Sequence, residues 1–316
     1  MAVFLGIDTS NYTTSAAIFD TENGMIHSKK LLPVKSGECG LRQSDAVFHH
    51  VQQLPEVIEQ IFAEYKGKID AIGVSSKPRD VEGSYMPCFT VGLSTAKILS
   101  EVMNVPIYTF SHQSGHIAAA LFSAKKYELF NKKFLAFHVS GGTTEAVLVT
   151  PDKEKVFSTE LIAKTLDLNA GQVIDRTGVM LGLSFPCGRE IEKLALKNTE
   201  KVTAKATLKG FDCCLSGVEN ICRRMYEAGE TKEKISATCL LYVEKALDEM
   251  CSRLINKFGK IPVLFAGGVV SNSIIKAHLS TKYNAYFAQP EFSADNAAGI
   301  AFLCSMQHHN NENKFI

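Results

Sequence analysis

Two histidines, His112 and His116, are the side chains whose type and spacing point most directly to chemistry. They lie in the stretch SHQSGHIAAAL, whose small and apolar residues predict a helix. Four residues apart on a helix, both imidazoles lie on one face and can bind a single metal ion. Two structural histidines would show the same spacing, so both interpretations stay open. Position 113 is Gln, so the glutamate base of an HExxH metalloprotease is missing.

A metal site built on two histidines needs a further ligand, which is usually a carboxylate. Asp295 is the candidate, because the stretch SADNAAG places it at the predicted start of the last helix. If the histidine pair binds a metal, Asp295 would complete the set.

Three turns rich in glycine or hydroxyl residues follow predicted strands. DTSNYTTS and VSGGTTEA each connect two strands, and their small residues let backbone N–H groups approach a phosphate. Gly267 and Gly268, in FAGGVVSNS, lie between a strand and a helix, a common place for nucleotide contacts in open α/β sheets. Asn272, in the first turn of that helix, can bind a ligand through its amide or cap the helix. Ordinary hairpin turns and a helix cap remain the alternatives.

Two carboxylates lie close to another glycine turn. Asp175 belongs to a helix-like segment, PCG forms the turn, and Glu192 follows on the next helix. Such a pair can hold the hydroxyl groups of a ribose, although solvated helix charges give the same pattern.

The elements that must position these residues alternate between strands and helices, which predicts an α/β fold. A strand–turn–strand pattern opens the chain at 2–20 and returns at 134–150. Two similar halves indicate a duplicated, two-lobe fold with a cleft between the lobes. We place the first lobe at 1–109 and the second, which carries the metal and nucleotide motifs, at 110–296. A final helix over about 297–316 can return to the first lobe.

The composition is that of a globular protein without a strong preference for a charged partner. Of 316 residues, 46% are hydrophobic and 21% charged, and the net charge of +1 provides no general attraction for nucleic acid or membranes. The lysine-rich stretch 124–134, which also holds two interleaved aromatics, is a local candidate, or a solvated face. Nine scattered cysteines without a CxxC pair indicate a reducing compartment. The N-terminus does not resemble a signal peptide, and no apolar run reaches the roughly 20 residues needed to cross a bilayer, so we expect a cytoplasmic location without membrane contact.

Six motifs in the same order resemble those of the TsaD family, the tRNA threonylcarbamoyladenosine transferases once described as O-sialoglycoprotein endopeptidases. They are HQSGH, HVSGG, DRTGVMLGLSFPCGREIEKLA, LSGVEN, FAGGVVSN and SADNAAGIA. The resemblance spans nearly the whole chain. It implies the ATPase fold shared by actin, hexokinase and heat-shock chaperones, and a transferase that moves a threonylcarbamoyl group from its adenylate to adenosine in tRNA.

The resemblance also implies a set of ligands and partners. His112, His116 and Asp295 would hold one divalent metal, and this mixed ligand set suits iron or zinc better than magnesium. The nucleotide would be ATP or the threonylcarbamoyl adenylate, and tRNA would be reached through a partner complex or a dimer with a family member. The implied nucleotide contacts are His138, Val139, Ser140, Gly141, Gly142, Asp175, Gly188, Glu192, Gly267, Gly268 and Asn272.

The first turn departs from the family pattern. Asp8 keeps an acidic side chain and is the candidate catalytic residue, but Asn11, Tyr12 and Thr13 replace the family's Cys, Asp and Glu. We therefore expect a diverged paralogue. Two alternatives stay open: a non-catalytic nucleotide-binding partner of the true transferase, and an ATP-dependent kinase of the same fold with Asp8 as its base.

Overall fold

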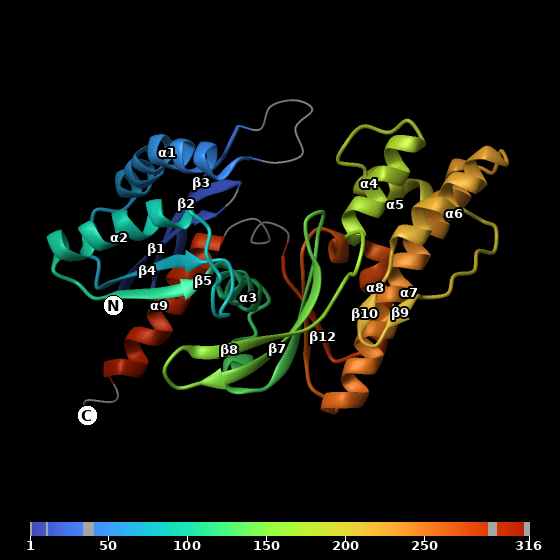
Figure 1. Ribbon diagram of the computed structural model, residues 1–316. Coiled ribbons are helices and arrows are strands. Elements are labelled where there is room, and N and C mark those ends of the chain that lie inside the picture. The colour runs from blue at the N-terminus through green and yellow to red at the C-terminus, as the bar shows by residue number, and fades with distance from the viewer. Residues whose placement is uncertain (1, 11, 34–40, 290–295, 313–316) are drawn as a thin grey trace. The chain divides into compact units, whose positions relative to one another are not determined.

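A computed structural model describes residues 2–10, 12–33, 41–289 and 296–312 (Figure 1). The chain divides into two compact units. The first contains Met1–Phe130, Pro151–Thr159 and Glu291–Ile316, and the second contains Asn131–Thr150 and Glu160–Pro290. Each unit is organised around a sheet of five strands. None of the helices described in the structure combines the length and apolar character needed to span a bilayer.

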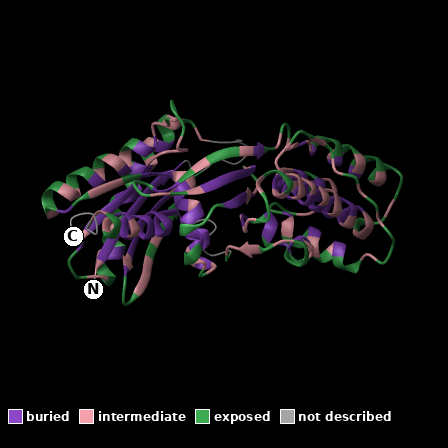
Figure 2. Ribbon diagram, turned by 90° about the horizontal axis from the view of Figure 1, so that it is seen from below, coloured by how far each residue is buried: buried purple, intermediate pink, exposed green. Residues whose placement is uncertain are grey.

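The first unit has a mixed sheet in the order β3-β2-β1-β4-β5. Its strands are β1 (Val3–Ser10), β2 (Thr13–Asp20), β3 (Gly24–Leu31), β4 (Ala71–Lys77) and β5 (Ile107–Ser111). The first three are antiparallel, and β4 and β5 continue the sheet in parallel. The side chains of β1 are buried along its whole length, so helices cover both faces (Figure 2).

Four helices provide that cover. The apolar residues of α1 (Gln43–Glu64) and α2 (Phe89–Met103) pack on one face of β1, β2 and β4. The last helix, α9 (Asn296–Glu312), packs on β1, β2, β4 and the preceding α3 (His112–Ser123). A Cβ built on Gly299 would lie 1.9 Å from the carbonyl oxygen of Gly115, so only glycine allows α9 and α3 to approach so closely.

The bounds of the first unit differ from those of the first lobe, which the sequence analysis placed at 1–109. The unit continues to Phe130, because α3 packs against α9 and belongs with the first sheet. It also contains α9, where the final helix was expected to return.

The second unit repeats the sheet pattern of the first. Its order is β12-β11-β6-β7-β8, in which β6 pairs antiparallel with β7 and parallel with β11, as β1 does with β2 and β4. The strands are β6 (Phe134–Val139), β7 (Thr144–Asp152), β8 (Val156–Lys164), β11 (Val263–Ala266) and β12 (Ala285–Phe287). The two sheets thus have equivalent strand pairing, as expected for a duplicated α/β fold.

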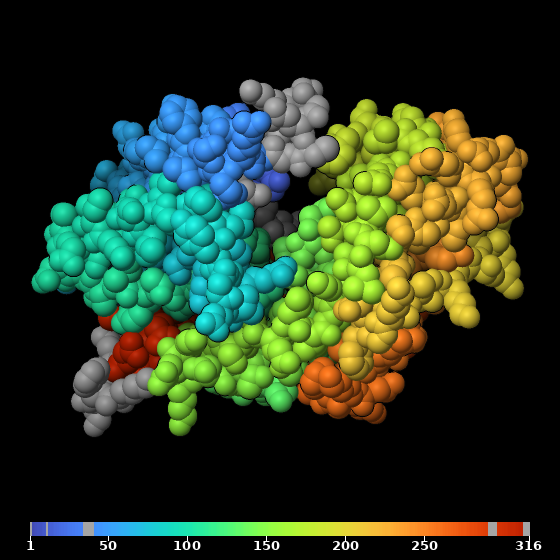
Figure 3. Space-filling model, viewed as in Figure 1, coloured from blue at the N-terminus to red at the C-terminus, as the bar shows by residue number. Residues whose placement is uncertain are grey.

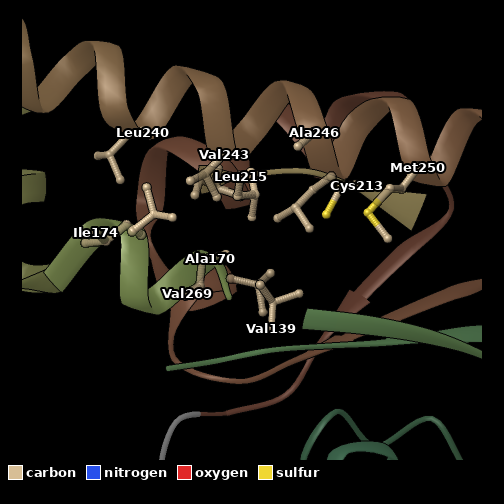
Figure 4. Packing of buried hydrophobic residues seen from close by; sticks show 14 of the residues in the cluster. Val139, Ala170, Ile174, Cys213, Leu215, Leu240, Val243, Ala246, Met250 and Val269 are labelled. Atoms are coloured by element: carbon tan, nitrogen blue, oxygen red, sulfur yellow. The ribbon is translucent and has the colours of Figure 1, made fainter. Parts of the chain in front are cut away.

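The helices of the second unit gather around one long helix, α7 (Lys232–Phe258). Leu240, Val243 and Ala246 on its buried face pack over Val139 and Val269 (Figure 4). The remaining helices are α4 (Ala170–Met180), α5 (Gly188–Lys197), α6 (Ser216–Glu227) and α8 (Ser273–Lys282), with the short 3-10 turn η2 (Val269–Ser271) and a small ribbon of β9 (Leu208–Lys209) and β10 (Asp212–Cys213). The other 3-10 turn, η1 (Tyr127–Asn131), lies where the first unit passes into the second. The core of the second unit supports the loops that follow β6 and β11.

Candidate functional site

The first candidate site begins where β5 runs directly into α3. Ser111 is the N-cap of α3, and its hydroxyl accepts a hydrogen bond from the backbone N–H of Ser114 at 3.1 Å. The Asp80 carboxylate accepts hydrogen bonds from both serine hydroxyls at 3.0 Å and pairs with Lys77. These bonds fix the first turn of α3, which carries His112.

The two histidines converge as the helical spacing predicts. The Nε2 atoms of His112 and His116 lie 3.0 Å apart. On its other side, His112 Nδ1 lies 3.0 Å from Oδ1 of Asp8, at the end of β1. The same carboxylate oxygen accepts hydrogen bonds from the Asn296 amide at 2.9 Å and from the Ser75 hydroxyl. Asp8 therefore holds the imidazole of His112 in a fixed orientation.

The pKa of Asp8 results from effects that oppose each other. Asp8 is 1% exposed, and burial alone would raise the pKa of its carboxyl. The charge of His112 and the hydrogen bonds from His112, Ser75 and Asn296 outweigh burial, and they hold the pKa of Asp8 well below its usual range. A carboxylate with a lowered pKa stays ionised near neutral pH and can accept the hydrogen bonds that position His112.

The histidine pair opens into a small cavity of about 190 Å³. Two nitrogens that each lie about 2.1 Å from one ion must be within about 4 Å of each other, and this pair meets that condition. The second oxygen of Asp8 is buried without a hydrogen-bond partner among the described residues. Asp295, the third predicted ligand, lies outside the described residues, and no three His, Cys, Asp or Glu side chains within the described ranges converge on one point. The cavity is lined by Asp8, Ser10, Tyr12, Thr13, Ser15, His112, His116 and Asn296.

Of the aromatic residues in the lysine-rich stretch 124–134, only Tyr127 is exposed, at 45%. Phe130 is 2% exposed, and the Tyr127 ring packs against Phe302 with 5.5 Å between centroids. The aromatic residues of this stretch thus contribute to packing.

The second candidate site lies in the second unit, at the glycine turn after β6. The Ser140 hydroxyl accepts hydrogen bonds from the N–H groups of Gly142 and Thr143 at 3.3 and 3.1 Å, and Ser140 N–H donates to the Thr143 carbonyl at 2.7 Å. The turn rests on the start of α4, where Gly171 N–H donates to the Ser140 carbonyl at 3.1 Å. A Cβ on Gly171 would lie 2.6 Å from the backbone nitrogen of Gly141, so the two segments are in direct contact.

The loop after β11 lies beside this turn. Gly267 has φ +103°, and a Cβ on it would lie 2.3 Å from the Val139 carbonyl oxygen and 3.1 Å from the His138 ring. Asn272 then caps α8, because its side-chain oxygen accepts from the N–H groups of Ile274 and Ile275 at 3.1 and 3.2 Å. The capping alternative for Asn272 is therefore realised, and the same residue lines the adjoining cavity.

Two carboxylates join the helices around this cavity. Glu192 accepts hydrogen bonds from the backbone N–H of Ser273, at 2.8 Å, and from its hydroxyl, which ties α5 to the start of α8. Asp175 on α4 accepts from the Cys187 N–H at 2.8 Å, just before α5. Burial raises the pKa of Asp175, against the opposing effect of that N–H. Each carboxylate thus stabilises the wall of the cavity by joining two of its segments through hydrogen bonds.

The residues predicted from separate motifs meet at one cavity of about 660 Å³. The predicted residues that line it are Ser140, Gly141, Asp175, Gly188, Glu192, Gly268 and Asn272. Of the other predicted contacts, Gly142 and Gly267 lie next to them in the same two loops, and His138 and Val139 are the last two residues of β6. The structure adds Gly171, Ile174, Pro186, Arg189, Val269 and Ser271. Most of these are direct neighbours of the predicted motifs, which is the signal that could have found them.

The sequence of this chain is similar to a known protein family and to individual proteins from two archaea. The sequence profile of the family described as TsaD, tRNA N6-adenosine threonylcarbamoyltransferase, matches residues 28–302. A Methanocaldococcus jannaschii protein named probable bifunctional tRNA threonylcarbamoyladenosine biosynthesis protein is 28% identical over 98% of this chain, and the match spans 56% of that protein, about half its length. The tRNA N6-adenosine threonylcarbamoyltransferase of Methanopyrus kandleri is 26% identical over 97% of this chain and 88% of its own.

A solved structure supports the fold independently of close sequence similarity. The ROK hexokinase of Thermus thermophilus matches with a TM-score of 0.51 at 15% identity, covering 98% of this chain and 99% of the hexokinase. The predicted fold shared by actin and hexokinase is confirmed. Because the family profile also covers most of the sequence, this chain belongs to the TsaD family of transferases.

Proposed function

We propose that this protein transfers a threonylcarbamoyl group from its adenylate to the exocyclic amine of an adenosine in tRNA. The family profile and the names of the relatives support this proposal. The observation that carries it is the cavity of about 660 Å³, where the glycine turn, both carboxylates and Asn272 meet. Its size is within the usual range of roughly 300–1,000 Å³ for a site that binds a small molecule.

In this proposal the nucleotide lies along the start of α4. The backbone N–H of Gly141, in the turn after β6, contacts the phosphate, because no bulky side chain keeps an anion away. Asp175 and Glu192 are placed to accept hydrogen bonds from ribose hydroxyls, since each uses one identified oxygen for the helix contacts described above. ATP and the threonylcarbamoyl adenylate share these groups.

The metal of the proposal is held by His112, His116 and Asp295. Asp8 orients His112, as carboxylates commonly orient histidines that bind metals. Iron or zinc fits the ligand set better than magnesium. When bound, the ion would act as a Lewis acid that polarises a carbamoyl or phosphate oxygen.

Transfer to tRNA is expected to be slow for this chain alone. Tyr12 and Thr13 stand at the cavity where the family carries acids, and loss of one preorganised electrostatic group typically costs on the order of 100-fold in rate. The net charge of +1 adds little attraction for the tRNA backbone, so we propose that a partner protein or a family dimer presents the tRNA. The same substitutions favour the second candidate, a nucleotide-binding partner without its own transfer activity. A cytoplasmic location fits the cysteines of the described ranges, which form no disulfide.

Complementation separates these two candidates. The protein would be expressed in a strain depleted of its own threonylcarbamoyl transferase, and the tRNA nucleosides would then be analysed. Partial restoration of the modified adenosine, abolished by His112→Ala, supports the transferase. No restoration, together with measurable ADP affinity, supports the non-catalytic partner.

The role of Asp8 is tested by metal titration. Asp8→Asn keeps the size of the side chain but removes its charge, and we expect zinc affinity to fall about 10- to 100-fold, as for other residues that orient metal ligands. Asp212→Asn, at a carboxylate in the second unit, is the control and should bind zinc as the unaltered protein does. Unchanged zinc affinity in Asp8→Asn would remove the positioning role.

A further inference from the structure

Arg189 is the single cationic residue that lines the second cavity, as far as the structure describes the chain. It is exposed, and within the described ranges it makes no hydrogen bond or ion pair. The acids nearest in sequence have other partners, because Glu190 pairs with Lys193 at 2.7 Å and Glu192 binds Ser273. An arginine at a cavity wall without an acidic partner is therefore available to a ligand.

The position of Arg189 indicates which part of a nucleotide it would meet. The glycine turn rests on Gly171, at the start of α4. Asp175 lies four residues further, which is about 6 Å along the helix axis. Its carboxylate binds Cys187, two residues before Arg189. The segment before α5 is thus joined to α4 about one helical turn beyond the residue on which the glycine turn rests, so we infer that Arg189 lies on the side of the base.

The neighbouring cavity wall also suits a base. Ile174, Pro186 and Val269 provide apolar surface in this wall. The helix that carries Arg189, α5, lies at the surface of the second unit (Figure 3). A guanidinium group is planar and stacks on aromatic rings, including nucleic-acid bases. The ammonium of lysine has no such plane.

We propose that Arg189 stacks on the purine base of the bound nucleotide and gives the site its preference for purines over pyrimidines. This inference rests on the proposed nucleotide site, but it assigns a residue that is not among the nucleotide contacts predicted from the sequence. The larger ring system of a purine offers more surface to the guanidinium plane, so the preference follows from stacking area.

Calorimetry with adenosine, ADP and CDP tests the proposal. Arg189→Ala should weaken adenosine and ADP by a similar factor, about three- to tenfold, and CDP less. Arg189→Lys should show most of the same loss, whereas Arg189→Phe should retain most of the adenosine affinity, because a phenyl ring still stacks. Lys197→Ala removes a positive charge from the last turn of the same helix and should change none of these affinities.

The opposite pattern would overturn the assignment. If Arg189 binds phosphate, Arg189→Lys keeps ADP affinity, Arg189→Phe loses it, and adenosine is unaffected by any variant. Arg189→Ala with unchanged affinity for all three ligands would likewise exclude a contact. If the unaltered protein binds none of the ligands, the proposed nucleotide site itself fails, and this inference fails with it.

Discussion

Gly171 is the residue through which the glycine turn rests on α4, and replacing it by alanine would push the two apart. A Cβ at this position lies 2.6 and 2.7 Å from the nitrogen and Cα of Gly141, and 2.8 Å from the carbonyl carbon of Ser140. All three neighbours are backbone atoms, so the turn has to shift as a whole. Overpacking of this kind typically costs about 1–3 kcal/mol of folding free energy.

Gly217 provides a matched control. It is the second residue of α6, as Gly171 is of α4, and a Cβ there has no heavy atom within 4 Å. Both substitutions gain at most about 1 kcal/mol from helix propensity. In urea denaturation we therefore expect Gly217→Ala to be as stable as the unaltered protein or slightly more so, and Gly171→Ala to be about 1–3 kcal/mol less stable than Gly217→Ala.

The same pair of variants reports on the nucleotide site. A displaced turn loses the hydrogen bond from Gly141 to phosphate, of about 1.5 kcal/mol, so calorimetry should show ADP binding roughly tenfold weaker in Gly171→Ala. Gly217→Ala should bind ADP normally. If Gly171→Ala matches the control in both stability and ADP affinity, the turn neither depends on this contact nor touches the nucleotide as argued.

Three further outcomes follow from other contacts. Asp248 is 8% exposed, and burial opposes ionisation, but its hydrogen bonds with Lys282 lower its pKa. Asp248→Asn should therefore destabilise the protein by about 1–3 kcal/mol at pH 7. In urea denaturation this difference should shrink as the pH falls below about 4, where the unfolded chain takes up the proton, and it should be lost as the pH falls through the lowered pKa of the folded protein. Gly115→Ala places a Cβ 2.5 Å from the Asn296 side chain and should weaken zinc binding in a titration. Thr14→Val removes a hydroxyl that bonds two buried polar side chains of α1 and should lower the unfolding free energy, measured with urea, by about 1–3 kcal/mol.

Local signals in the sequence were sufficient for the elements and for the wall of the second cavity. The strand–turn–strand pattern at 2–20 and 134–150 predicted the duplication, because hairpins and their turn residues are close in sequence. Glycine turns likewise marked Ser140 and Gly268, which line the cavity. A turn that leaves room for a ligand is rich in glycine and other small residues, and this composition can be recognised in the sequence.

Features that depend on contacts between segments far apart in the sequence could not be predicted from local patterns. The first unit runs past 109 because α3 packs on α9, a helix nearly two hundred residues later in the chain. Asp8 was predicted as the candidate catalytic residue, and its hydrogen bonds from Ser75 and Asn296 could not be predicted because they join segments far apart in the sequence. Arg189 lies within a recognised motif but was not singled out, because its availability depends on the other partners of Glu190 and Glu192.

The placement of α9 in the first unit determines when that unit can be completed during synthesis. The hydrogen bond between Asn296 and Asp8 joins residues 288 positions apart, so it cannot form until almost the whole chain has left the ribosome. Ala17 of the sheet meets its partners Ala297, Ala298 and Ala301 only then. The second unit ends at Pro290, so it can fold before α9 has been synthesised. Until then, one face of the first sheet is not covered by α9. The histidine pair thus lacks its supporting amide until Asn296 has been synthesised, and a chain that stops short of residue 296 would carry both histidines without the contact that anchors Asp8 beside them.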